Sequence, residues 1–94
     1  MKEIFRLKEM LEHENIPFEF EEHKDLCGFQ IGYPTLPKNE KCVCSVIQHK
    51  YSYGSHFNLL EICGFDNDEV EGFLTADLVF DKIECHYKEM NKWN

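Results

Sequence analysis

The sequence has no long apolar run and a deficit of basic residues, and each absence excludes a class of protein. No stretch approaches the roughly 20 apolar residues that a membrane-spanning helix requires. The first segment, MKEIFRLKEMLEHE, carries Glu and Lys among its apolar positions, unlike a secretory signal, so we expect an intracellular protein without a membrane anchor. Lys and Arg total 10 against 18 Asp and Glu, which gives a formal net charge of −8. Direct binding to nucleic acid, which needs a basic surface, is therefore not expected.

Motifs for metal binding and catalysis are also missing. A structural zinc site usually pairs two C-x₂₋₄-C motifs, whereas this chain offers Cys42-x-Cys44 and an isolated Cys85-His86. There is no nucleophile elbow, phosphate loop or HExxH motif. Five cysteines, an odd number in an intracellular setting, indicate free thiols rather than a disulfide framework. We therefore expect no metal, no cofactor and no enzymatic activity.

The 94 residues are enough for a single domain spanning 1–94, and 43% apolar content is enough for a core. Apolar side chains recur at helical spacing in two segments, and alternation or β-branched residues mark three others. The predicted helices are 3–14 and, after a Thr75 cap, 75–91, and the predicted strands are 17–23, 27–33 and 42–49. These elements predict an α+β domain, a three-stranded antiparallel sheet with helices packed on one face.

Two further segments are predicted to lie outside that sheet. Ser55 or Asn58 would cap a short helix over residues 59–62, which Gly64 would end. The segment FDNDEVEGFL, residues 65–74, reads as an acidic loop. The expected order is therefore α-β-β-β-α-α.

The segment HKYSYGSHFNLLE, residues 49–61, concentrates cations, aromatic rings and small hydroxyls directly ahead of the predicted short helix. Helix N-termini present unpaired N–H groups that suit anions, Ser and His donate to phosphate oxygens, and Tyr rings stack on bases. A polar loop with one Tyr packed on the core and no ligand is the alternative. The candidate ligand-binding residues are His49, Lys50, Tyr51, Ser52, Tyr53, Gly54, Ser55 and His56.

Three segments resemble those of small proteins encoded by phages and prophages of Gram-positive bacteria. They are VCSVIQH (43–49), SYGSHFNLLEICG (52–64) and GFLTA (72–76), and the resemblance extends from about residue 16 onward. It implies an accessory phage protein working in the cytoplasm of the host bacterium. Proteins of that kind often counter host defence, either by sequestering a nucleotide immune signal or by blocking a defence protein.

Two functions follow as expectations. The first is a non-enzymatic binder of a phosphate-bearing small molecule, such as a cyclic nucleotide, acting as a homo-oligomer because one small domain cannot enclose a nucleotide. The second is an acidic inhibitor that sets Glu19, Glu21 and Glu22, with the 66–71 segment, against a basic surface of a host defence protein. A small structural or assembly protein is the third possibility. The first two differ in which charges binding depends on: the cations of residues 49–56 or the carboxylates.

Overall fold

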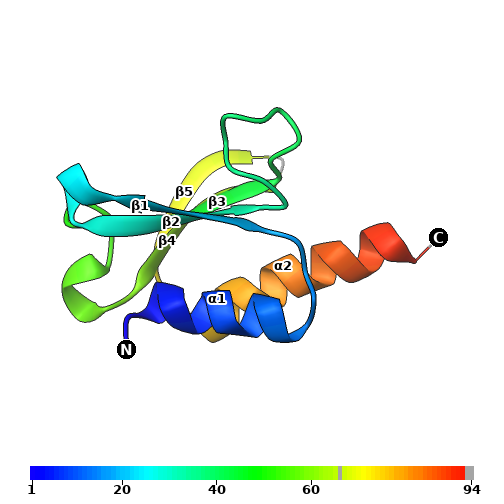
Figure 1. The fold of residues 1–94 in the computed structure, drawn as a ribbon, viewed down its shortest axis with the longest axis horizontal. Helices are drawn as coiled ribbons and strands as arrows, with labels where there is room; N and C mark the ends of the chain where they lie inside the picture. The colour runs from blue at the N-terminus through cyan, green and yellow to red at the C-terminus, as the bar shows by residue number, and fades with distance from the viewer. Residues whose placement is uncertain (66, 93–94) are drawn as a thin grey trace.

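The computed structural model describes residues 1–65 and 67–92, within which the chain forms two α-helices and five β-strands. In chain order these are α1 (Glu3–His13), β1 (Glu19–His23), β2 (Gly28–Tyr33), β3 (Cys44–Gln48), β4 (Leu60–Gly64), β5 (Asn67–Leu74) and α2 (Ala76–Asn91). Short 3-10 turns cover Lys24–Leu26 and Ser55–Phe57. Both helices lie on one side of the sheet, and the loop between β2 and β3 rises on the other (Figure 1). None of the described helices is long and apolar enough to cross a lipid bilayer.

The five strands pair antiparallel in sequence order, β1-β2-β3-β4-β5, so every connection joins neighbouring strands. Phe20 lies opposite Ile31, Ile31 opposite Val46, and Val46 opposite Ile62, which forms one apolar row across the sheet. This row faces the helices and makes one side of the core. The buried side chains that the helices add to it are Ile4, Leu7, Leu11, Ala76, Val79, Phe80 and Ile83.

The expected α+β class, with helices on one face of an antiparallel sheet, is confirmed. The three predicted strands and both long helices lie within two residues of their predicted ends. The predicted cap of the last helix is also present, since the Thr75 hydroxyl accepts a hydrogen bond from the Leu78 N–H at 3.2 Å. Regular periodicity was therefore a sufficient signal for these elements.

The expected three-stranded sheet and the α-β-β-β-α-α order are wrong, because the sheet has two more strands. Residues 59–62 do not form a helix: Leu60 and Ile62 alternate inward on β4, which pairs with β3. The segment predicted as an acidic loop contains β5, although Asp66 lies outside the described residues. Register shifts interrupt the pairing of β4 with β5, and Phe73 takes a left-handed φ of 59°. These irregularities break the alternation that would have revealed a strand.

The start of α1 is tied to the sheet by side chains rather than by a local cap. The Ile4 N–H donates to Gln48 Oε1 at 3.0 Å, and the Glu3 N–H donates to Asn58 Oδ1 at 3.0 Å. Gln48 Nε2 in turn donates to Asn58 Oδ1 at 2.7 Å. The Glu3 carboxylate accepts the Ala76 N–H at 2.6 Å, so it caps the first turn of α2. Both helices therefore begin at one hydrogen-bonded cluster beside the end of β3.

Replacing Gln48 with Leu should lower the free energy of unfolding by about 1–3 kcal/mol, because the buried Ile4 N–H loses its acceptor. Gln30→Leu is the matched control. The Gln30 side chain bonds to His23 and Ser45, which are partly exposed and can turn to water, so its loss should cost under about 1 kcal/mol. Urea denaturation followed by circular dichroism measures both. Equal losses would show that Gln48 does not secure the helix start.

Candidate anion-binding site

The loop between β3 and β4 carries all eight residues of the predicted site, and its own hydrogen bonds fold it. Ser52 is buried, and its Oγ accepts from the His49 N–H at 3.0 Å and donates to the His49 carbonyl oxygen at 2.9 Å. The Tyr51 N–H donates to His49 Nδ1 at 3.1 Å, which places the ring proton on Nε2 as an outward donor. The Ser52 hydroxyl thus makes its hydrogen bonds within the loop and stabilises the loop conformation.

The helix that was expected to aim its N–H groups at a phosphate is absent from this loop. Ser55–Phe57 forms a three-residue 3-10 turn, and the chain then enters β4 through Asn58, which has a left-handed φ of 57°. Gly54 has a φ of 99°, and a Cβ there would lie 2.9 Å from the Phe73 backbone. Gly54 is therefore required by the packing of the loop on β5. The site has no helix dipole and depends on side chains alone.

A polar groove of about 240 Å³ lies beside this loop and collects cations from distant parts of the chain. We call it the cationic groove. Among the described residues no carboxylate lines it, and neither Lys2 nor Lys50 forms an ion pair. Lys2 and Cys27 were missed by the sequence prediction, because only the tertiary fold brings the start of α1 and the β1–β2 hairpin to this loop. The lining residues are Lys2, Cys27, Gln48, His49, Lys50, Ser55 and His56.

A second depression, of about 340 Å³, adjoins the groove, because Lys50 and His56 line both. Four large rings flank it and are mostly exposed: Tyr51 at 72%, Tyr53 at 63%, Phe57 at 72% and Phe73 at 57%. We call this surface the aromatic shelf. Lys50 Nζ lies 5.1 Å from the centroid of the Tyr51 ring, so a cation is held at the boundary of the two parts. Nothing in the sequence predicted that Phe73 would belong to this site; it stood out there only as an apolar residue within an acidic segment.

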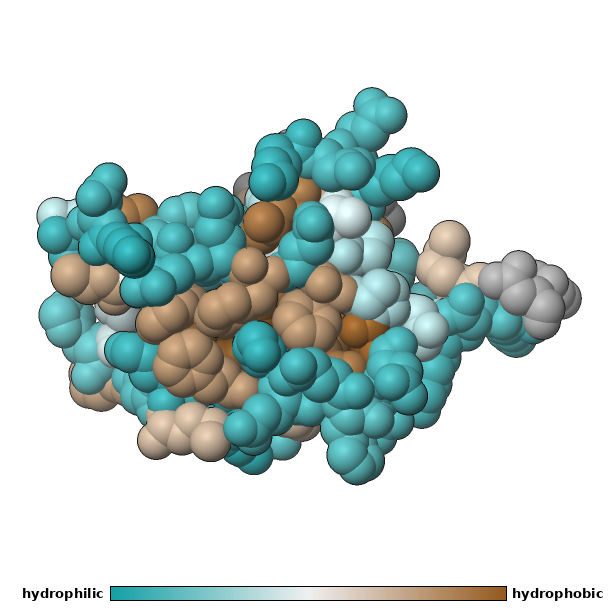
Figure 2. All heavy atoms as spheres, in the orientation of Figure 1, coloured by the Kyte–Doolittle hydropathy of each residue, from teal (hydrophilic) through white to brown (hydrophobic). Residues whose placement is uncertain are grey.

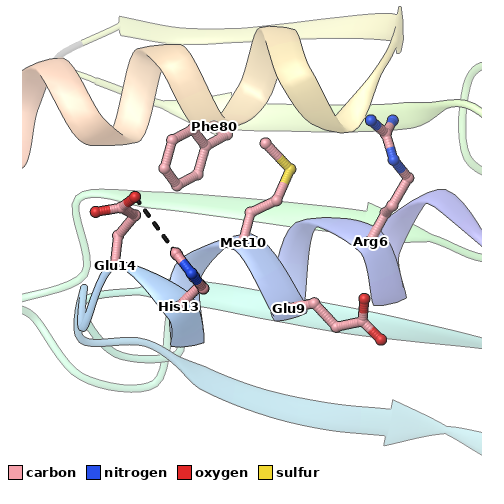
Figure 3. A pocket seen from close by; sticks show the side chains of 6 residues that line it. All are labelled: Arg6, Glu9, Met10, His13, Glu14 and Phe80. Carbon is pink, nitrogen blue, oxygen red and sulfur yellow. Dashed lines mark ion pairs between the residues drawn. The ribbon is translucent and has the colours of Figure 1, made fainter.

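A larger groove, of about 390 Å³, runs between α1 and α2 and contains none of the predicted site residues. Met10 from α1 and Phe80 from α2 both extend into the space between the two helices (Figure 3). Its remaining lining residues are Arg6, Glu9, His13 and Glu14. His13 Nδ1 lies 3.6 Å from Glu14 Oε1, and the two carboxylates offset the two basic groups. This groove therefore offers an anion no net attraction.

Cys42, Cys44 and Cys63 lie close enough to interact electrostatically, and burial governs the chemistry of the first two. Cys42 precedes β3, and its Sγ donates to the Cys44 carbonyl oxygen at 3.3 Å. Burial raises the pKa of the Cys44 thiol to about 12 and that of Cys42 in the same direction. Burial also raises the pKa of Tyr33 to about 12, and its hydroxyl lies 2.7 Å from His86 Nδ1. Within residues 1–65 and 67–92 no three His, Cys, Asp or Glu side chains are placed to hold a metal ion.

The acidic residues assigned to the alternative function lie on opposite edges of the sheet. Glu19, Glu21 and Glu22 belong to β1, whereas Glu69 and Glu71 belong to β5, with three strands between them. The two groups are therefore not neighbours in the sheet, and each must be considered as a separate surface.

Comparison with known proteins identifies no relative: no family model, no curated protein and no solved structure matches the chain.

The free energy of unfolding should fall as the pH rises from about 9 toward 12. In the unfolded chain the Cys44 thiol and the Tyr33 phenol return to ordinary pKa values of 9.0 and 10.0, whereas burial keeps both protonated in the fold. Ionisation in this range therefore favours the unfolded state, and the stability held below pH 9 is lost as the folded pKa values are approached. Urea titrations at a series of pH values measure the slope.

Cys44→Ala should make that slope shallower, while Cys85→Ala, at an exposed position, should leave it unchanged. A wild-type stability that is constant from pH 9 to 12 would contradict the effect of burial.

Proposed function

We propose that this protein is a non-enzymatic binder that sequesters a phosphate-bearing small molecule, such as a cyclic or linear nucleotide. The observation that carries the proposal is the cationic groove, where Lys2, His49, Lys50 and His56 converge and no carboxylate among the described residues joins them. The ammonium groups of Lys2 and Lys50 repel one another when they are held in one groove, and a bound anion would relieve that repulsion. The chain has 18 Asp and Glu residues that could have neutralised these lysines, yet no carboxylate is found in the described lining of the groove.

The aromatic shelf supports a ligand that has a planar part as well as a charged part. A phosphate in the cationic groove would receive charge-assisted hydrogen bonds from Lys50 and the imidazole N–H groups. A base attached to that phosphate would reach the exposed rings next to Lys50 and His56, which line both parts of the site. Stacking of one base on an aromatic side chain contributes about 1–3 kcal/mol.

The charge of the whole molecule favours a small ligand over a nucleic-acid strand. A net charge of −8 repels an extended chain of phosphates, whereas a single phosphate can be enclosed by local cations. The groove, at about 240 Å³, is large enough to hold a phosphate group. Sequestration requires affinity and no turnover, which suits a site made of binding groups.

The biological setting that we propose comes from the resemblance of residues 43–49, 52–64 and 72–76 to small phage proteins. A phage protein in the host bacterial cytoplasm that lowers the free concentration of a nucleotide immune signal would act as an anti-defence sponge. The host–virus interaction would then depend on the amount of protein made, because each site holds one ligand.

Replacing Lys50 with Gln should weaken nucleotide binding by about tenfold and reduce its dependence on salt, because one cation is lost from the groove. Lys41→Gln is the matched control, since Lys41 is exposed in the β2–β3 loop outside the site. Tyr53→Ala should cost about tenfold to a hundredfold through lost stacking. Calorimetry against cyclic nucleotides, linear nucleotides and inorganic phosphate measures affinity, and thermal melts verify folding.

Failure of the wild-type protein to bind any of these probes would refute the proposal. So would equal losses in Lys50→Gln and Lys41→Gln, which would show that only the general charge matters.

A homo-oligomer should form through the aromatic shelf, because its exposed rings leave apolar surface uncovered and a single copy covers one side of a ligand. Light scattering at micromolar concentration should give a mass above that of one 11.2 kDa chain. Phe57→Ser should shift the mass toward the monomer, and Leu78→Ser, which removes an exposed apolar side chain on α2, should not. A monomeric wild-type protein, with and without nucleotide, would exclude this assembly.

A further inference from the structure

The outer edge of β1 lies on the opposite side of the sheet from β5 and its Phe73. In the described part of the chain β1 pairs only with β2, so alternate N–H and C=O groups of Glu19–His23 point outward from the sheet. Such an edge can accept one further strand from another molecule. The side chains around the edge decide which strand it would accept.

The two faces next to this edge differ in chemistry. Phe20 faces the helices, so Glu19 and Glu21, its neighbours on either side, face the opposite way. Both carboxylates are exposed. Glu19 Oε1 accepts the Leu36 N–H at 2.9 Å, and Glu21 Oε2 lies 3.8 Å from His23 Nε2. An added strand would therefore meet negative charge on the outer face.

The helix-side face of the same edge is apolar. Phe5, Phe20 and Phe29 form a ring cluster with centroid separations of 4.7 to 6.1 Å, and all three are only partly buried. Figure 2 shows hydrophobic surface gathered between β1 and α1, where this cluster lies. Lys8 Nζ lies 5.5 Å from the Phe20 ring at its border. An added strand would therefore find apolar contacts on this face.

Charge disfavours a second copy of the chain as the occupant. Antiparallel pairing of β1 with β1 of a second copy, centred on Glu21, would set the two Glu21 side chains opposite each other, and like charges directly opposite are destabilising. The other edge strand, β5, carries Glu69 and Glu71, and Glu71 is already paired with Lys82 at 3.8 Å, so β5 differs from β1 in the charge that it presents. The β1 edge therefore disfavours a second copy and favours a basic strand.

We propose that β1 binds an extended basic segment of another protein by strand addition. The segment alternates Lys or Arg, which oppose Glu19 and Glu21 on the outer face, with apolar side chains that cover Phe20 and Phe5 on the helix side. Backbone hydrogen bonds supply affinity, and the alternation supplies specificity. This surface is independent of the cationic groove, and it gives the acidic residues of β1 a function that the nucleotide site does not use.

The test uses a fluorescent peptide, Lys-Val-Lys-Phe-Lys-Val-Lys, and the full chain. Fluorescence polarisation measures affinity, and amide exchange followed by NMR locates the peptide. Two control peptides share its composition: one groups the four Lys at one end, and the other is N-methylated at alternate positions so that it cannot pair along an edge. We expect the alternating peptide to bind at least about tenfold more tightly than either control and to protect amides of residues 18–23.

The matched protein variants are Glu19→Gln/Glu21→Gln on β1 and Glu69→Gln/Glu71→Gln on β5. The β1 pair should weaken peptide binding by about tenfold, while Gln still accepts the Leu36 N–H, and the β5 pair should leave it unchanged. Equal binding of the grouped-Lys or N-methylated peptide would overturn the proposal, as it would indicate general charge attraction. Three other results would overturn it as well. They are protection of β5 amides instead of β1 amides, protection of β1 by self-association of the protein, and no binding at millimolar peptide.

Discussion

The hydrogen-bonded cluster at the start of α1 is the constraint on which the rest of the molecule depends. Gln48 and Asn58 accept the first N–H groups of α1, and the carboxylate of Glu3 accepts the first N–H of α2. One cluster thus sets where both helices begin relative to β3. It also brings Lys2 beside His49, so the geometry of the cationic groove follows from the same bonds that attach the helices to the sheet.

Sequence patterns predicted those elements whose periodicity is regular, namely both long helices and the first three strands. They failed at β4 because residues 59–62 form a short apolar run that suits a helix or a strand equally, and only pairing with Val46 and its neighbours decides between them. They failed at β5 because charged residues occupy an edge strand whose register is shifted. Both errors concern pairing between strands, and a local sequence pattern carries no information about which distant segment a strand pairs with.

The candidate site was predictable to the extent that its residues are contiguous. Residues 49–56 remain together in one loop, and clustered His, Lys and Tyr were a usable signal. Lys2, Cys27 and Phe73 come from three other elements, and the sequence held no sign that the fold would assemble them there. Roles within the loop also required the structure, since nothing in the sequence distinguishes Ser52, which folds the loop, from Ser55, which lines the groove.

The remote capping of α1 has a consequence for how the chain acquires its fold during synthesis. An isolated helix of 11 residues is only marginally stable in water, and the partners of its first N–H groups stand 44 and 55 residues further along the chain. On the ribosome, α1 emerges before the β3–β4 loop and has nothing to hold its start until that loop has also emerged. The helix is thus consolidated later than the strands that follow it in the chain, and its apolar stripe stays uncovered until they have formed.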